Sequence, residues 1–334
     1  MERILGRSGI PISALGLGCW AIGGPFLLDG KPDGWGTVDD AESVRAIRGA
    51  LDLGVRFFDT ADVYGAGHSE RVLGRAIARC RDDIVISTKF GYTFDPQTKR
   101  AGGTNASVAY IRAACEASLR RLDTDYIDLY HLHIWSLPEA QAAEVASVLE
   151  ALRCEGKIRA YGWSTDDLDC ARVFAQQPGC AAIQHQLNVL DDAPELIEIC
   201  DAHDLASINR TPLAMGLLSG KFDASVTLPC DDVRGAGHQW VRYFVNATPS
   251  REALDRLATI RDILTSNGRT AAQGALAWIW SRSERTIPIP GFKTVAQAEE
   301  NARALAFGPL TTEQLSEIEL LLGRTATTER AVAS

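Results

Sequence analysis

The chain has 334 residues, 46% of them hydrophobic and 23% charged, which is enough apolar material for a folded core. A formal net charge of −9 without a Lys/Arg-rich cluster excludes the basic field that nucleic-acid binding requires. No segment approaches the roughly 20 consecutive apolar residues of a membrane span, and no long apolar run follows Met1. We therefore expect a cytoplasmic protein with neither a membrane nor a nucleic-acid partner.

The eight cysteines are scattered singly, without a C-x-x-C pair or a Cys/His spacing typical of zinc. They occupy positions 19, 80, 115, 154, 170, 180, 200 and 230. We expect no disulfide framework and no bound metal.

In chain order, residues 3–13 predict a β-hairpin with Ser8-Gly9 at its turn, placed to close a barrel floor. Short β-branched runs then alternate with longer helical patterns. Strands are predicted near 15–19, 54–59, 83–89, 126–133, 158–164, 181–184, 205–209 and 285–288. Helices are predicted near 40–53, 69–79, 105–122, 138–153, 166–176, 193–203, 251–266, 270–281 and 295–305.

Strand–helix alternation of this kind predicts a parallel sheet, and eight such units without a composition break favour an α/β fold of the (β/α)8 TIM-barrel class. We predict one barrel domain over residues 1–322 and a disordered tail over 323–334. The longest irregular segments, 23–39 and 221–249, are predicted to be lids or binding loops on the C-terminal face.

Polar residues follow six of the predicted strands at their C-terminal ends, where barrel enzymes place their active sites. They are Asp59, Lys89, His133, Ser164, Gln184 and the pair Asn209-Arg210. Convergence on one rim predicts a pocket that contains acidic, basic and hydrogen-bonding groups.

Three motifs add specificity to this pattern. Residues 58–70 read F-D-T-A-x-x-Y-G-x-G-x-S-E, with Ser69 a candidate N-cap for the next helix. Residues 128–133 read D-L-Y-x-L-H, and 289–301 read I-P-G-x-K-x-x-x-Q-x-x-E-N. Through these motifs, the chain resembles the aldo-keto reductase superfamily from about Arg3 to Leu305.

The resemblance implies an NADPH-dependent oxidoreductase that transfers a hydride to an aldehyde or ketone, reversibly. Tyr64 would donate the proton to the carbonyl oxygen. Lys89 would bring the tyrosine pKa down from its ordinary value of about 10 by stabilising tyrosinate, and Asp59 would keep Lys89 charged. His133 would donate a hydrogen bond to the substrate oxygen.

By the same resemblance, the nicotinamide carboxamide is held by Ser164, Thr165 and Gln184, with Thr165 in place of the usual asparagine. Residues 207–221 look like the family's pyrophosphate loop, with Arg210 where an aromatic residue usually stacks on the nicotinamide. Its charge would favour the reduced cofactor, so Arg210→Tyr is expected to tighten NADP⁺ more than NADPH. The alternative for Arg210 is a surface ion pair that points away.

Further cofactor contacts are expected along the loops and the last motif. They are Gly18, Trp20, Asn209, Thr211, Leu213, Gly216, Lys221, Gly291, Lys293, Thr294, Gln297, Glu300 and Asn301. Lys293, Thr294 and Gln297 would approach the adenosine 2′-phosphate, with Thr294 capping the following helix. Substrate contacts are expected from Trp20, Phe90 and Trp163, and further aromatic candidates are Trp35, Trp240, Tyr243 and Phe244.

One motif match is rejected, and two other interpretations remain open. Gly16-Leu17-Gly18-Cys19-Trp20-Ala21 matches the dinucleotide motif G-x-G-x-x-A, but Gly23-Gly24-Pro25 follows at once and leaves no helix N-terminus for a pyrophosphate. The pair His131 and His133 faces one side of a strand, as in a metal-dependent hydrolase barrel. A non-catalytic, cofactor-sensing subunit is the third possibility, and loss of a catalytic residue would have favoured it.

Overall fold

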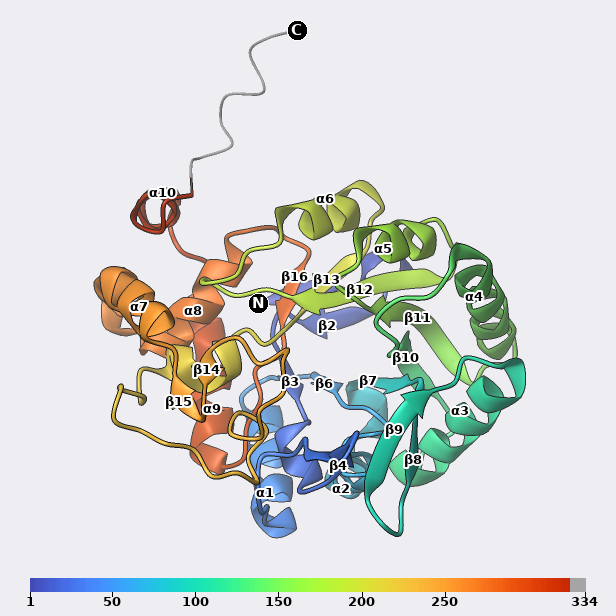
Figure 1. The fold of residues 1–334 in the computed structure, drawn as a ribbon. Helices are drawn as coiled ribbons and strands as arrows, with labels where there is room; N and C mark the ends of the chain where they lie inside the picture. Colours follow the sequence, from blue (N-terminus) through green and yellow to red (C-terminus); the bar gives the residue numbers. More distant parts are fainter. Residues whose placement is uncertain (325–334) are drawn as a thin grey trace, which may run out of the picture.

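The computed structural model describes residues 1–324, and its centre is a parallel sheet in the order β16-β13-β12-β11-β10-β7-β6-β3. These eight strands are β3 (Gly16–Gly18), β6 (Phe57–Asp59), β7 (Val85–Phe90), β10 (Ile127–Leu132), β11 (Ile158–Ser164), β12 (Cys180–Gln186), β13 (Ala206–Arg210) and β16 (Thr286–Pro288). The sheet curls so that its two edge strands face each other (Figure 1). The predicted (β/α)8 barrel is confirmed.

Gly18 lies where the barrel closes. Its amide donates to the Pro290 carbonyl at 3.0 Å, and it pairs in parallel with Gly291. A Cβ at position 18 would lie 2.9 Å from the Ile289 carbonyl oxygen, so only glycine allows this approach. A short 3₁₀ turn, η2 (Ala21–Gly23), follows instead of an α-helix, which confirms the rejection of the dinucleotide motif.

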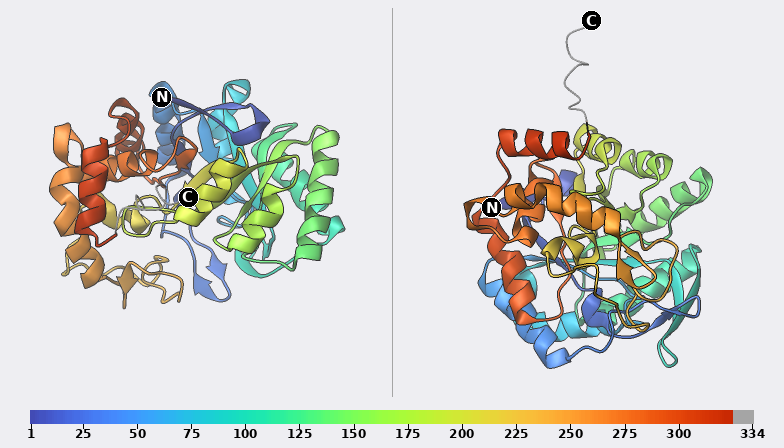
Figure 2. Two further views of the ribbon diagram at one scale, coloured as in Figure 1. Left: turned by 90° about the horizontal axis from the view of Figure 1, so that it is seen from above. Right: turned by 60° about the vertical axis from the view of Figure 1, so that its left-hand side comes forward.

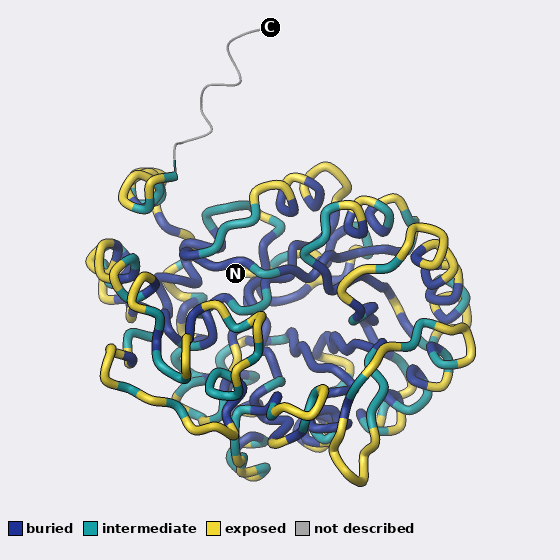
Figure 3. The backbone as a smooth tube through the Cα atoms, in the orientation of Figure 1, coloured by how far each residue is buried: buried dark blue, intermediate teal, exposed yellow. Residues whose placement is uncertain are grey.

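Helices surround the barrel with their apolar faces inward and their exposed faces outward (Figure 3). They are α1 (Asp40–Asp52), α2 (His68–Ile77), α3 (Val108–Leu122), α4 (Glu139–Cys154), α5 (Leu168–Ala175), α6 (Pro194–Ala202), α7 (Arg251–Leu264), α8 (Ala271–Trp280) and α9 (Val295–Arg303). Their starts follow the expected chemistry, with Ser107 capping α3 and Thr294 capping α9. Ser69 is not the N-cap of α2, because Gly67 holds that position and the Ser69 hydroxyl donates to the Cys19 carbonyl at 2.7 Å.

The N-terminal hairpin of β1 (Glu2–Ile4) and β2 (Pro11–Ser13) closes one end of the barrel. Leu5, Ile10 and Ile12 pack in one buried cluster with side chains that point inward from the barrel strands. The connection is a 3₁₀ turn, η1 (Gly6–Ser8), followed by Gly9 in the left-handed region. The predicted hairpin and its place at the barrel floor are confirmed.

The long segments 23–39 and 221–249 lie at the opposite end of the barrel from this hairpin (Figure 2, left). The first contains β4 (Leu27–Leu28) and β5 (Lys31–Pro32), which join β8 (Tyr92–Asp95) and β9 (Arg100–Thr104) in a small sheet. The second ends in the short ribbon of β14 (Phe244–Val245) and β15 (Thr248–Pro249). None of these short strands was predicted.

The last described helix is α10 (Thr312–Leu321), which was also not predicted. It packs beside α7, and its Glu319 accepts a hydrogen bond from the Trp278 indole of α8 at 3.2 Å. Within the predicted tail, Arg324 donates to the Val189 carbonyl at 3.1 Å, whereas 325–334 lie outside the described residues.

The eight cysteines are free thiols, five of them buried. Among residues 1–324, no helix has the length and apolar character needed to cross a bilayer.

Candidate active site

A buried ion pair lies at the C-terminal ends of two neighbouring strands. Asp59 ends β6 and pairs with Ser87 on β7. Lys89 lies two residues beyond Ser87 on the same strand. Lys89 Nζ lies 2.6 Å from Asp59 Oδ2 and donates to the Thr60 carbonyl at 2.6 Å. Asp59 Oδ1 accepts from Ser87 Oγ at 2.7 Å and from Gln184 Nε2 at 2.8 Å. Both charged side chains are therefore fixed by several hydrogen bonds.

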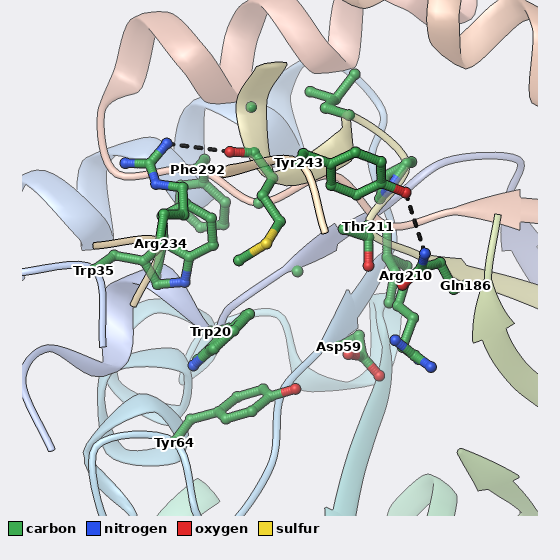
Figure 4. A pocket seen from close by; sticks show the side chains of 18 of the residues that line it. Trp20, Trp35, Asp59, Tyr64, Gln186, Arg210, Thr211, Arg234, Tyr243 and Phe292 are labelled. Atoms are coloured by element: carbon green, nitrogen blue, oxygen red, sulfur yellow. Dashed lines mark hydrogen bonds between the residues drawn. The ribbon is translucent and has the colours of Figure 1, made fainter. Parts of the chain in front are cut away.

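Tyr64 reaches this pair from the loop after β6. Its hydroxyl lies 3.3 Å from Lys89 Nζ and points toward Asp59 (Figure 4). The loop is held by an approach of two backbones, since a Cβ on Gly65 (φ 60°) would lie 1.9 Å from the Gly23 carbonyl oxygen. This contact explains the glycine that follows the tyrosine in the motif.

Burial and the neighbouring charges have opposite effects on the pKa values of Lys89 and Tyr64. Burial alone would lower the pKa of Lys89, but the Asp59 carboxylate and the Tyr64 hydroxyl outweigh it and raise that pKa above its usual value. Burial raises the pKa of Tyr64, while the Lys89 ammonium acts against that rise. The predicted influence of Lys89 is present, but the expected net fall in the tyrosine pKa is wrong because burial is the larger effect.

His133 lies just past β10 with its ring perpendicular to that of Tyr64, the two centroids 6.0 Å apart. Burial, together with the positive charge of Lys89, holds the pKa of His133 well below its usual value. Its imidazole is therefore neutral at pH 7 and carries one N–H donor.

These groups open into a cavity of about 700 Å³ at the C-terminal end of the barrel, a volume typical of small-molecule sites. Asp59, Tyr64 and His133 line it, whereas Lys89 lies behind them, fully buried. Most predicted cofactor residues line the same cavity: Gly18, Trp20, Ser164, Gln184, Arg210, Thr211, Leu213, Gly216, Lys221, Gly291, Lys293, Gln297, Glu300 and Asn301.

Three predicted cofactor residues do not line the cavity. The Thr165 hydroxyl donates to the Trp135 carbonyl at 2.7 Å and accepts from the Asp167 amide, so it organises the start of α5. The Asn209 amide binds the backbone of β16 and the Ser207 hydroxyl. The Thr294 hydroxyl accepts the Gln297 amide as the cap of α9.

Two of the three predicted substrate residues are also core residues. Phe90 is fully buried and stacks on Tyr130, with centroids 4.7 Å apart. Trp163 is fully buried and donates to the Ile134 carbonyl at 2.7 Å. Both side chains point outward from their strands toward the helices, so the prediction that they contact substrate is wrong; only Trp20 of the three lines the cavity.

Arg210 combines the two interpretations given to it. Its side chain lines the cavity, and its guanidinium is paired with the Asp166 carboxylate. The other oxygen of Asp166 accepts the Gln186 amide at 2.7 Å, so the carboxylate is fixed. The positive charge expected beside a nicotinamide is thus partly offset by an acid that sequence patterns did not identify.

Three cations, Lys221, Arg234 and Lys293, line the cavity in the region of the last motif. Burial, followed by the nearby Arg234, lowers the pKa of Lys221, and burial also lowers that of Lys293. The Arg234 guanidinium lies 4.6 Å from the centroid of the Trp35 ring (Figure 4). It also forms an ion pair with Asp232. An anion here would relieve the repulsion among the three cations.

Arg234 was not predicted, and neither was Asp33, an acid that lines the cavity among aromatic residues. Both belong to the long segments predicted as binding loops, which is the only signal for them in the sequence. Of the other aromatic candidates, Trp35, Trp240 and Tyr243 line the cavity, whereas Phe244 packs against Phe222.

The hydrolase alternative finds no support in the geometry. His131 is buried in the barrel interior, and neither of its ring nitrogens has a hydrogen-bond partner within residues 1–324. In that part of the chain, no three His, Cys, Asp or Glu side chains lie close enough to hold a metal ion.

Comparison with known proteins agrees with the motifs and with the barrel. The sequence model of the Aldo/keto reductase family matches residues 14–322. The chain belongs to this family. It is 32% identical to the aldo-keto reductase YhdN of Bacillus subtilis over 324 residues, which cover 95% of this chain and 92% of the relative.

Two further relatives of this aldo/keto reductase differ in their described activity or ligand. The NADH-specific methylglyoxal reductase of Escherichia coli is 32% identical, over 91% of this chain and 94% of its own length. A Klebsiella pneumoniae aldo/keto reductase solved with NADP and acetate is 26% identical, with a TM-score of 0.72 and coverage of 97% and 96%.

The fold is also shared with the glycerol dehydrogenase AKR11B4 of Gluconobacter oxydans. Its structure superposes with a TM-score of 0.80 at 29% identity, covering 99% of this chain and 98% of that one. The chain is therefore an oxidoreductase of the aldo/keto reductase family.

Proposed function

We propose that this aldo/keto reductase reduces an aldehyde or ketone with NADPH, reversibly, and that Tyr64 is its proton donor. The observation that supports this best is the Tyr64 hydroxyl at the cavity wall, 3.3 Å from the ammonium of a buried Lys89–Asp59 pair. An acid, its charge-stabilising partner and a cavity for a carbonyl compound are thus assembled in one place.

The residues present fit a dinucleotide phosphate. Lys221, Arg234 and Lys293 supply positive charge along one part of the cavity, and α9 begins beside them. Ser164 and Gln184 present polar groups near Asp59, where a carboxamide would be held. When bound, the nicotinamide supplies the hydride that adds to the carbonyl carbon.

Protonation then depends on the chain's own groups. Because burial raises the pKa of Tyr64, its hydroxyl is protonated at neutral pH and available to the carbonyl oxygen. The Lys89 ammonium stabilises the tyrosinate that remains, and Asp59 keeps Lys89 charged. The neutral imidazole of His133, beside Tyr64, donates a hydrogen bond to the same carbonyl oxygen.

A relative at 32% identity is named as NADH-specific, so membership of the family does not by itself decide between NADPH and NADH. The proposed preference for NADPH rests on Lys293. In this chain, Lys293 Nζ donates to the Trp35 carbonyl at 2.6 Å, so a 2′-phosphate would have to share that ammonium or displace it. Lys293→Met should lower kcat/KM with NADPH and leave kcat/KM with NADH within about twofold.

The experiment that tests the proposal mixes the protein with NADPH or NADH and a panel of aldehydes and ketones, following absorbance at 340 nm. Wild type should oxidise NADPH with at least one carbonyl compound. Tyr64→Phe, which keeps the ring, should lose about 10²–10⁴-fold in kcat, the usual contribution of a general acid. Equal activity of the two proteins would show that Tyr64 is not the donor.

A non-catalytic, cofactor-sensing role predicts a different result. In that case, wild type would bind NADPH but reduce no carbonyl compound, and Tyr64→Phe would bind the cofactor equally well. The intact geometry of Asp59, Tyr64, Lys89 and His133 favours catalysis over this alternative.

A further inference from the structure

Asp33 is an acid at the cavity wall that the proposed chemistry does not use. It lies just after β5 in segment 23–39, is only 6% exposed, and lines the cavity. Its Oδ1 is buried and has no hydrogen-bond partner among residues 1–324. A buried carboxyl oxygen without a donor is costly. Oδ1 is closed to solvent, so a ligand in the cavity would reach the small part of the carboxyl group that is still exposed.

No cation of the described chain balances this carboxyl group. Its one ion-pair neighbour within residues 1–324 is His238, whose Nε2 lies 3.5 Å from Oδ1. That nitrogen is directed instead to the Pro32 carbonyl, at 2.7 Å. Burial, with a smaller contribution from the like charge of Asp29, raises the pKa of Asp33 to about 8.

Aromatic rings surround the same part of the cavity. The Trp20 indole donates to the Asp33 carbonyl at 2.9 Å and stacks over the Tyr64 ring, with centroids 5.9 Å apart. The Trp20 ring also lies beside those of Trp35 and Trp240, with centroids 5.3 and 6.0 Å apart. Asp33 and Tyr64 both line the cavity, and the charge of Asp33 adds a small contribution to the raised pKa of Tyr64.

We propose that Asp33 determines substrate specificity by binding a hydrogen-bond donor of the substrate, an ammonium or a hydroxyl group, beside the tryptophan cluster. The inference rests on the proposed reductase function for its kinetic test, but its binding test does not. Of the two donors, an ammonium group gains both the ionised carboxylate and the faces of the indole rings, so it should bind more tightly once the pH exceeds the raised pKa of Asp33, about 8. A substrate that carries a carboxylate at this end should be rejected.

The kinetic test uses four para-substituted benzaldehydes that differ only in the group offered to Asp33: methyl, hydroxymethyl, dimethylammoniomethyl and carboxylate. The assays are run above the raised pKa of Asp33, where Asp33→Asn keeps the shape of the side chain and removes its charge. We expect kcat/KM to fall about 10- to 100-fold for the ammonium compound, the range of a charged hydrogen bond, and about fivefold for the hydroxymethyl compound. The methyl compound should change less than twofold, and the carboxylate compound should improve.

Asp125→Asn is the matched control, because Asp125 is exposed and does not line the cavity. It should leave the ratios among the four substrates unchanged. If Asp33→Asn changes all four values equally, or changes none, the proposal is wrong. A fall for the hydroxymethyl compound alone would assign the site to hydroxyl donors rather than ammonium donors.

Binding is measured separately, without hydride transfer, from the quenching of tryptophan fluorescence by benzyldimethylammonium ion and by benzyl alcohol. Wild type should bind the ammonium ion, and Asp33→Asn should bind it at least tenfold more weakly. If binding depends on Asp33 in this way but the protein reduces no aldehyde, the role of Asp33 as a binding residue stands and the proposed reductase function is wrong. Equal affinity of the two proteins for both probes, or no binding by wild type, overturns the role of Asp33.

Discussion

Replacing Lys89 by methionine removes the ammonium group from a buried ion pair. Lys89 is fully buried, Asp59 is 2% exposed, and their charged atoms lie 2.6 Å apart. Breaking such a pair leaves an uncompensated buried carboxylate, at a cost of about 3–5 kcal/mol. At about 2 °C per kcal/mol for a large domain, Tm should fall by roughly 6–10 °C.

The double variant Asp59→Asn/Lys89→Met separates stability from catalysis. The introduced asparagine keeps an oxygen for the donors Ser87 and Gln184, which lie 2.7 and 2.8 Å from Asp59 Oδ1 in the wild type, and no charge remains buried. We expect most of the lost Tm to return. Activity should stay about 10²–10⁴-fold below wild type, because Tyr64 still lacks the ammonium group at 3.3 Å from its hydroxyl.

The assay pairs thermal unfolding, followed by circular dichroism, with the kcat of NADPH oxidation on the best aldehyde found. Lys99→Met is the control, because Lys99 is exposed and its loss should change neither quantity. The reasoning is refuted if Lys89→Met keeps wild-type activity, or if the double variant regains activity together with stability.

Three further outcomes follow from charges around the cavity. Asp166→Asn leaves the Arg210 guanidinium without its partner and should weaken NADP⁺ relative to NADPH severalfold, by equilibrium fluorescence titration; equal changes would contradict this. Glu42→Gln removes a carboxylate that accepts the Val295 amide at 2.8 Å at the start of α9, so NADPH affinity should rise relative to NADH, and an unchanged affinity ratio would count against a 2′-phosphate there. Asp33 has a raised pKa of about 8 when folded, so it binds a proton that the unfolded chain has lost, and its contribution to stability falls as pH rises from about 4 to 8. The Tm of Asp33→Asn minus that of wild type should therefore grow between pH 5 and pH 8, whereas a constant difference would exclude the buried charge.

The sequence by itself was sufficient for the barrel and for the residues of the proposed acid-base group. Strand–helix alternation records which side chains face the core, and this local pattern persists through the chain, so the barrel strands were recognised to within a few residues. Asp59, Lys89 and His133 were found because each lies at or just beyond the end of a strand, and all parallel strands end at the same rim. Tyr64 came from its motif.

Local patterns failed where a contact joins distant segments. Phe90 and Trp163 are aromatic residues near strand ends, but alternation along each strand turns them outward to the helices, so a shift of one position decides between cavity and core. Thr165 lies one residue past β11, and the Trp135 carbonyl claims its hydroxyl across the rim. The short strands β4 and β5 of segment 23–39 pair with each other, and β4 also pairs with β9, about 70 residues away.

Two charged residues of the cavity wall, Arg234 and Asp33, could not be identified from local sequence patterns. Arg234 and Asp33 lie in irregular loops with no periodicity, so nothing local distinguishes them from solvated surface charges. Only the folding of both loops over one end of the barrel buries Asp33 without a hydrogen bond and presses Arg234 against Trp35. The sequence determined the fold and indicated the residues of the proposed acid-base group, because these follow from periodicity, from strand ends and, for Tyr64, from a motif. The tertiary structure decided which charges line the cavity, because burial and pairing depend on residues far apart in the chain.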